Sequence, residues 1–469
     1  MTAVIQAASG VRYALVVPQQ ATRLTDRHPS TQASAPVPSR VFIPFFIGSL
    51  VLTLTWGSTL GMINLARLTA GWGLGTLPRP SVWAHAYVQV FGFMALFIMG
   101  VAYHVLPRFV GGTLQHARLI PWSFWLQLAG VVGIACGFFL PESFTRPLWI
   151  AGSTSLLIAA VLFCTVVFRT LAAGVPGREP FRRWVVAGAC WLVISSALAL
   201  TAALADDLTW HRVLWTAALS GFVSSWIFGV GRRILPIFLG CRPRWGSLEL
   251  PAFILYQLGV VAWVAGAWPH PDLDVVRGIG AALLIPSILG YTACVGLFGR
   301  VGPIFGCAVR SPQDGWQRYV FAAWGWLFVS VALGPGWTFV RLFTGGAESL
   351  LLLDFARHAM AFGFAAQMVL GVASRVVPNF TGKALWSPSA RDAAFYLLNA
   401  SMAVRALEVP VGLGLWPQAW GYIAWSGPLA VLAMVLFAMN IIMTVRPRQS
   451  PLLQPAVPAQ MLQPLAGRK

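Results

Sequence analysis

Two histidines, His85 and His358, are the residues of this chain best suited to carry out chemistry. Each lies near the start of an apolar segment, 15 residues before Gly100 and 13 residues before Gly371, two glycines that hold the same place in a repeated phrase. In helices, this difference of two residues keeps the imidazoles within one turn of equal depth. Two neutral imidazoles at matched depth can be the axial ligands of one haem iron. The pair therefore predicts a low-spin, bis-histidine haem b site with His85 and His358 as the iron ligands.

The alternative interpretation is a pair of histidines that are hydrogen bonded separately near the membrane surface. The two residues alone leave both interpretations open. Small residues stand seven positions after each histidine, at Gly92 and Ala365. Because residues seven apart share a helical face, we expect a slot beside each imidazole for the edge of a flat macrocycle.

Arginines near the same end of the apolar segments are candidates for binding haem propionates. Arg405 is the first of these, followed by Arg357 and Arg341, because a guanidinium binds carboxylates in a bidentate manner. Arg405 also stands three residues before Glu408, and this spacing allows an ion pair on one helix. Arg405 is therefore predicted as a cofactor-binding residue, with the ion pair as the alternative.

The repeated phrase reads Gly-Phe, then glycine, then His or Arg, then proline, phenylalanine and glycine at fixed spacing. Its three copies start at Gly92, Gly221 and Gly363, and a degraded copy keeps Gly296, Arg300, Pro303 and Phe305. Glycines eight residues apart let membrane helices approach closely, and the proline ends the helix. His104 takes the place that arginine holds in the other copies. We therefore interpret His104 as a residue of a helix interface and not as a ligand.

The composition indicates a membrane protein. Of the 469 residues, 58% are hydrophobic and 10% are charged, and the mean hydropathy is +0.73. Apolar runs of about 20 residues are long enough to cross the bilayer as helices. The sequence predicts an all-α polytopic protein with about 12 transmembrane helices in one domain over residues 41–445, between disordered cytoplasmic tails at 1–40 and 446–469. The predicted spans are 41–66, 83–107, 120–140, 147–171, 184–205, 213–239, 251–268, 276–298, 318–341, 354–378, 391–412 and 416–444.

The net charge of +19 is explained by topology. Basic residues collect in alternate connections between the spans, whereas acids such as Asp206, Asp207 and Asp272 lie in the others. This is the positive-inside pattern, which places both termini in the cytoplasm of a multi-pass protein of the bacterial inner membrane. The expected partners are membrane lipid and a redox partner protein or quinol, and no nucleic acid. The six cysteines show no C-x-x-C spacing, so they are interpreted as small core residues without disulfides.

The residues around the two histidines resemble subunit I of the haem-copper oxidases. A-H-A-Y at 84–87 is similar to the motif of a haem ligand in the second span of that subunit, and P-N-F-T-G at 378–382 is similar to the end of its tenth span. The resemblance implies a bundle like oxidase subunit I with internal repeats. Ala356 stands where that family has the histidine of its oxygen-reducing haem, and the sixth and seventh spans have no histidine inside them. The resemblance therefore implies the low-spin haem pair without an oxygen-reducing centre.

The chain also resembles the NnrS family of haem- and copper-containing membrane proteins linked to the nitric oxide response. G-R-R-I-L-P-I-F at 231–238 and V-A-S-R-V-V-P-N-F-T-G-K at 372–383 are similar to phrases of that family. The His-x-His-Glu-Met motif usual at the second span is missing, because Trp83 and Val88 stand near that place. The sequence therefore leaves open whether the protein binds copper, and no residues support a copper site.

Together these features predict a haem-binding membrane protein of the NnrS or oxidase-like class. It would act in the nitric oxide response or in electron transfer. If it is an enzyme, it is an oxidoreductase of the electron-transfer type and not an oxygen reductase. The competing prediction is a cofactor-free polytopic transporter or membrane scaffold, in which the repeated phrase only packs helices.

Overall fold

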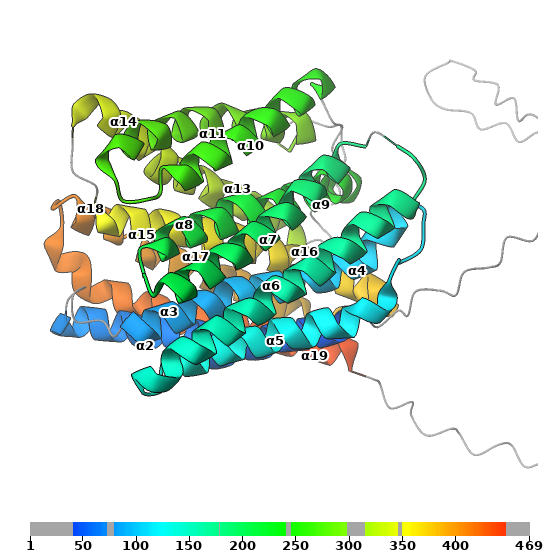
Figure 1. Ribbon diagram of the computed structural model, residues 1–469, viewed down its shortest axis with the longest axis horizontal. Coiled ribbons are helices and arrows are strands. Elements are labelled where there is room, and N and C mark those ends of the chain that lie inside the picture. The colour runs from blue at the N-terminus through cyan, green and yellow to red at the C-terminus, as the bar shows by residue number, and fades with distance from the viewer. Residues whose placement is uncertain are drawn as a thin grey trace, which may run out of the picture. The chain divides into compact units, whose positions relative to one another are not determined.

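The fold consists of long helices that run side by side (Figure 1). The structure is a computed structural model that describes residues 41–72, 79–177, 179–240, 245–297, 315–345 and 349–446. Within these ranges the chain forms helices and no strands. Eleven of the described helices are long and apolar enough to cross a membrane. The chain is therefore an all-α polytopic membrane protein, as predicted. The predicted tails lie outside the described residues, except for residue 446.

The spans are built from α-helices, several of which continue through π-helical segments. The α-helices are α1 Phe42–Leu52, α2 Ser58–Arg67, α3 Arg79–Tyr87, α4 Leu96–Phe109, α5 Ile120–Gly137, α6 Glu142–Ala173, α7 Phe181–Ala205, α8 Trp210–Thr216, α9 Ser224–Leu239, α10 Glu249–Ala265, α11 Asp274–Val295, α13 Trp316–Val331, α14 Trp337–Thr344, α15 Leu350–His358, α16 Gln367–Thr381, α17 Pro388–Arg405, α18 Glu408–Gly412 and α19 Ser426–Val445. The π-helical segments are η1 Thr53–Gly57, η2 Leu68–Trp72, η4 Val88–Ala95, η6 Ala217–Val223, η11 Ala332–Gly336 and η12 Ala359–Ala366.

One predicted span differs from the other eleven. The span predicted at 391–412 corresponds to α17, which has 18 residues and ends at Arg405. Its sequence includes Arg391 and Asp392 as well as Arg405, so it is less apolar than the eleven candidate spans. The chain then turns and forms the short helix α18.

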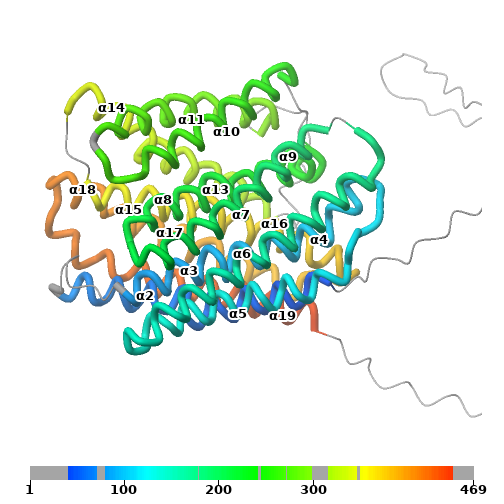
Figure 2. Tube along the Cα trace, viewed as in Figure 1, coloured from blue at the N-terminus to red at the C-terminus, as the bar shows by residue number. Residues whose placement is uncertain are grey.

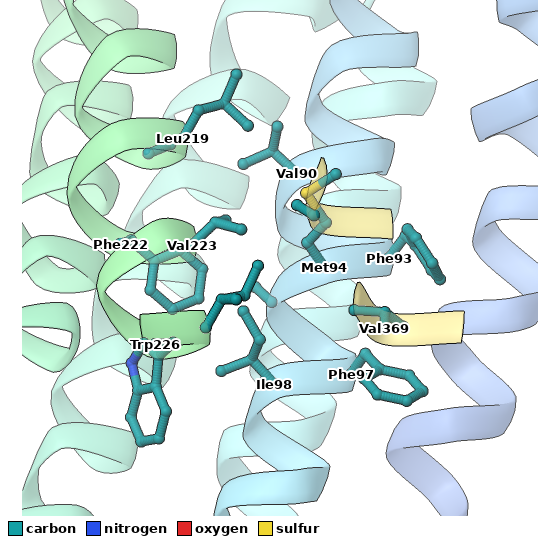
Figure 3. Packing of buried hydrophobic residues seen from close by; sticks show 14 of the residues in the cluster. Val90, Phe93, Met94, Phe97, Ile98, Leu219, Phe222, Val223, Trp226 and Val369 are labelled. Carbon is teal, nitrogen blue, oxygen red and sulfur yellow. The ribbon is translucent and has the colours of Figure 1, made fainter. Parts of the chain in front are cut away.

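The three spans that carry the repeated phrase form the centre of the bundle. In their most apolar windows, 94% (80–109), 83% (210–239) and 78% (350–381) of the residues are buried, whereas no other candidate span exceeds 56%. Figure 3 shows apolar side chains of the second span, including Met94 and Ile98, facing those of the sixth, including Phe222. The phrase therefore belongs to helices that face protein on nearly all sides.

The glycines of the phrase allow close helix contact, as predicted. A side-chain carbon added at Gly100 would lie 2.7 Å from Cβ of Phe45 on α1, and one added at Gly371 would lie 2.5 Å from Cβ of Tyr319 on α13. Both distances are shorter than a van der Waals contact. In these two copies the phrase thus packs its helix against the preceding span.

Each Gly-Phe pair of the phrase lies in a π-helical segment. These segments are η4, η6 and η12, and η6 packs against the other two. A π-helical turn bonds residue i to i+5, so it shifts the face that later residues present, and such turns are frequent at functional sites. η4 begins three residues after His85, and η12 begins directly after His358. The repeat therefore encodes a local change of helix geometry beside both histidines.

Candidate functional site

His85 and His358 line one cavity of ≈ 540 Å³ between α2, α3, η4, α15, η12, α17 and α19. Most of its wall is apolar, with side chains such as Phe93, Phe362 and Met402. Charged side chains line it as well, namely Asp354, Arg357 and Arg405. The cavity can therefore receive a ligand with a large apolar body and an anionic edge.

The two imidazoles face each other across this cavity. Their ring centroids are 6.5 Å apart and their planes differ by 17°. Two imidazoles bound to one iron would have centroids roughly 6 Å apart, because each iron–nitrogen bond is about 2 Å and each ring centre lies about 1 Å beyond its nitrogen. The predicted proximity of His85 and His358 is therefore confirmed, while their role as iron ligands stays a prediction.

Each imidazole is held through its Nδ1 atom. Nδ1 of His85 is 2.7 Å from the carbonyl oxygen of Gly57, and Nδ1 of His358 is 2.9 Å from the carbonyl oxygen of Asp354. Metal-binding histidines usually donate the second ring N–H in this way, which fixes the ring and the tautomer. Among the hydrogen bonds of the described residues, none involves the Nε2 atom of either ring. Both Nε2 lone pairs are thus available to a ligand in the cavity.

Two glycines of the first span seat His85, and sequence reasoning missed both. Gly57 supplies the carbonyl that binds Nδ1, and a side-chain carbon added at Gly61 would lie 2.7 Å from Cε1 of His85. The signal in the sequence was their small-x-x-x-small spacing, which permits close contact between membrane helices.

We expect Gly61→Ala to displace the ring of His85, because the new methyl group would overlap it. The ring would then lose its bond to Gly57, and binding of any ligand that needs Nε2 would fall by about tenfold or more, the effect of a cost above roughly 1.4 kcal/mol. Haem content per protein after purification measures this. Gly325→Ala is the matched control, because nothing lies within 4 Å of the added carbon. Equal haem content in the two variants would contradict the seating of His85 by Gly61.

The expectation of a slot for a macrocycle beside Gly92 and Ala365 is wrong. A side-chain carbon at Gly92 would lie 2.9 Å from Leu52, so this glycine faces α1, and neither Gly92 nor Ala365 lines the cavity. The physical reason is the π-helical geometry of η4 and η12. It rotates the residues that follow each histidine, so the position seven residues on no longer shares the histidine's face.

Arg405 joins two carboxylates at the edge of the cavity. Its Nη2 atom is 2.6 Å from Oδ2 of Asp354 and 3.2 Å from Oε1 of Glu408. The ion pair with Glu408 is therefore present, as the alternative interpretation predicted. The bond to Asp354 was not predicted, and the same carboxylate oxygen lies 3.4 Å from Nδ1 of His358. Arg405, Asp354 and His358 thus form one connected polar group.

A second polar group lines the cavity next to His85. The hydroxyl of Thr53 donates to Oε1 of Gln89 at 2.9 Å, and Nε2 of Gln89 donates to Ser58 at 3.3 Å. Gln89 stands four residues after His85, and this spacing in a helix is the signal that could have linked them.

His104 and His211 lie outside the histidine pair. His104 is 1% exposed, and its ring centroid lies 3.6 Å from that of Phe380, so it is an interface residue as interpreted. His211 is fully buried, with its ring stacked on that of Trp83, at 4.2 Å between centroids, and on that of Trp149, at 5.4 Å. Neither residue lines the cavity.

A comparison with known protein families shows to which family the chain belongs. Residues 38–448 match the model of the NnrS protein family. The chain belongs to the NnrS family. The match includes all the described residues, and with them the phrase-bearing spans and the cavity. A search of curated proteins finds no match to this chain. Within the described residues, no group of three or more His, Cys, Asp or Glu side chains could hold a metal ion, so these residues add no support for copper.

Proposed function

We propose that this NnrS protein binds one b-type haem between His85 and His358 and acts in electron transfer or in the nitric oxide response. The observation that carries the proposal is the opposed pair of imidazoles at 6.5 Å, each with Nδ1 held and Nε2 directed to no protein partner among the described residues. The coordinating atoms would be the two Nε2 nitrogens.

The cavity supports this proposal by its size and by its chemistry. Its volume of ≈ 540 Å³ is in the usual range for sites that enclose a cofactor or small molecule. A porphyrin has an apolar body, which the aromatic and aliphatic wall would enclose. Its propionates would lie toward the guanidinium groups of Arg357 and Arg405, and Arg405 would hold the Asp354 carboxylate at the same time.

When bound, the haem supplies one-electron redox chemistry. The protein's residues determine which use is made of it. His85 and His358 would hold the haem through two imidazoles, a pair of ligands that is suited to electron exchange and not to the reduction of oxygen. The Nδ1 bonds to the carbonyl oxygens of Gly57 and Asp354 would hold the two rings in place around it. A quinol or a redox protein is the partner class we propose.

The reduced-minus-oxidised optical spectrum of the purified protein tests this function. The proposal predicts the sharp α and β bands of a low-spin b-type haem at about one haem per chain, since the cavity holds one pair of imidazoles. A protein purified intact from haem-replete cells without these bands would instead support the cofactor-free transporter or scaffold.

We also propose that the termini lie in the cytoplasm of a bacterial inner membrane, because of the distribution of basic residues. In a variant without native cysteines, Asp207→Cys and Ser247→Cys should label with an impermeant maleimide from opposite sides, position 207 from the periplasm. The two positions flank the span Trp210–Leu239; Ser247 is exposed and Asp207 is partly exposed. Labelling of both from one side would contradict this topology.

A further inference from the structure

Two cysteines meet across the hairpin of α6 and α7. Cys164 lies nine residues before Ala173, the last residue of α6, and Cys190 lies nine residues after Phe181, the first residue of α7. The equal spacing places both at the same depth in antiparallel helices. α6 packs along α7, and the side chains of Cys164 and Cys190 interact across this interface, with both cysteines free of disulfides. The two thiols are therefore neighbours at the interface of α6 and α7.

The pair lies on a face that the rest of the chain does not cover. Cys190 is exposed, and so are Val186 and Ile194, one turn before and after it, at 38% and 42%. On α6, Val161 is exposed at 46%. An exposed apolar face on a membrane-spanning helix contacts acyl chains. Nine residues correspond to about 14 Å of helix, so the pair lies within the hydrocarbon region.

The interpretation of the cysteines as core residues is thus wrong for Cys190. Cys164 is 8% exposed and fits that interpretation, but Cys190 presents its side chain toward lipid. A small-molecule reagent dissolved in the membrane can reach it. A charged reagent in water cannot, because it would have to enter the hydrocarbon region.

We propose that Cys164 and Cys190 form a redox-active dithiol, which lipid-soluble oxidants of the quinone class convert to a disulfide. Both S–H bonds break and one S–S bond forms. Two electrons and two protons pass to the quinone, which becomes the quinol. Reactants and products are all neutral, which suits a reaction in a medium of low dielectric constant. This site is independent of the proposed haem.

The disulfide would join a peripheral hairpin to the central helices. α7 packs on α6 on one side and on η6 and α9 on the other, and Figure 2 shows α7 between α6 and α9. α8, which leads into η6, carries Trp215 in the wall of the cavity. Oxidation of the pair would therefore restrain α7 and, through it, the segment α8–η6 that carries Trp215.

A cleavable hairpin tests the proposal. A site for a specific protease is inserted between Pro176 and Gly177, in the exposed connection between α6 and α7. Membranes holding the full-length protein are treated with a short-chain quinone, alkylated with N-ethylmaleimide, solubilised and cleaved. On a non-reducing gel we expect the two fragments to run together as one band, and dithiothreitol should separate them. Untreated, pre-reduced membranes should give two separate fragments.

The chain supplies matched controls. The N-terminal fragment contains Cys136 as well as Cys164, so Cys136→Ser should keep the quinone-dependent link and Cys164→Ser should lose it. Ferricyanide, which is charged and excluded from the hydrocarbon region, should link far less protein than the quinone. Fragments that separate after quinone treatment, in protein that elutes as a monodisperse peak, would overturn the proposal. So would a link that survives Cys164→Ser or one formed by ferricyanide alone.

Discussion

Replacing either His85 or His358 by alanine should abolish the low-spin haem spectrum while the protein stays in the membrane. Each variant removes one of the two imidazoles, whose ring centroids lie 6.5 Å apart in the cavity. Loss of one strong axial ligand costs the bis-histidine state entirely, so the expected effect is complete loss of the α band and a fall in haem content of at least about tenfold. Helix packing should persist, because it depends on the glycines of the repeated phrase.

His104→Ala is the control within the same span. His104 lies 19 residues after His85, about 28 Å along a helix, so the two cannot bind one iron. It packs instead on Phe42 and Phe380. Haem content should be nearly unchanged in this variant, although stability should fall. If His104→Ala removed haem and His85→Ala did not, the site would lie at the opposite end of the central spans.

Opposite changes of charge beside His358 should move the haem midpoint potential in opposite directions. The Asp354 carboxylate lies 3.4 Å from Nδ1 of His358 and stabilises positive charge on the ligand and on the ferric iron. Asp354→Asn should therefore raise the potential. Arg405 binds that carboxylate at 2.6 Å and offsets its charge, so Arg405→Gln should lower the potential. We expect shifts on the order of 59 mV, a tenfold change in the ratio of reduced to oxidised protein.

Redox titration of the α band measures both variants. Asp207→Asn and Arg146→Gln are the controls, because they make the same charge changes at positions that do not line the cavity. They should leave the potential close to that of the wild type. A purely structural role for Asp354 and Arg405 would shift both variants in the same direction or lower haem content without a shift. Either result would refute electrostatic control by this pair.

Much of the fold follows from the hydrophobic runs alone. A membrane helix must satisfy its backbone internally, so length and apolarity are sufficient to place a span, and eleven predicted spans match candidate membrane helices. The repeated glycines also predicted close packing, which Gly100 and Gly371 show. The π-helical segments were not predictable, because a change from i+4 to i+5 bonding depends on packing between helices and not on residue type.

The site was predicted only in part for the same reason. The sequence predicted that His85 and His358 lie close together, because both lie at the same depth in their spans. Depth follows from the number of residues, since each residue of a helix adds a fixed rise. The faces of the residues that follow them depend on the π-helical register, so Gly92 was misplaced. Gly61 and Asp354 reach the histidines from other turns or other spans, and only tertiary structure reveals such contacts.

An electron cryomicroscopy map of the purified protein at side-chain resolution would show whether a haem lies between His85 and His358. We expect density for one flat macrocycle between His85 and His358, with both Nε2 atoms about 2 Å from a central metal. The carboxylate edge of the macrocycle should lie beside Arg357 and Arg405. Density for a macrocycle elsewhere, or an intact protein purified from haem-replete cells whose map shows lipid or closed helices between the two imidazoles, would contradict it.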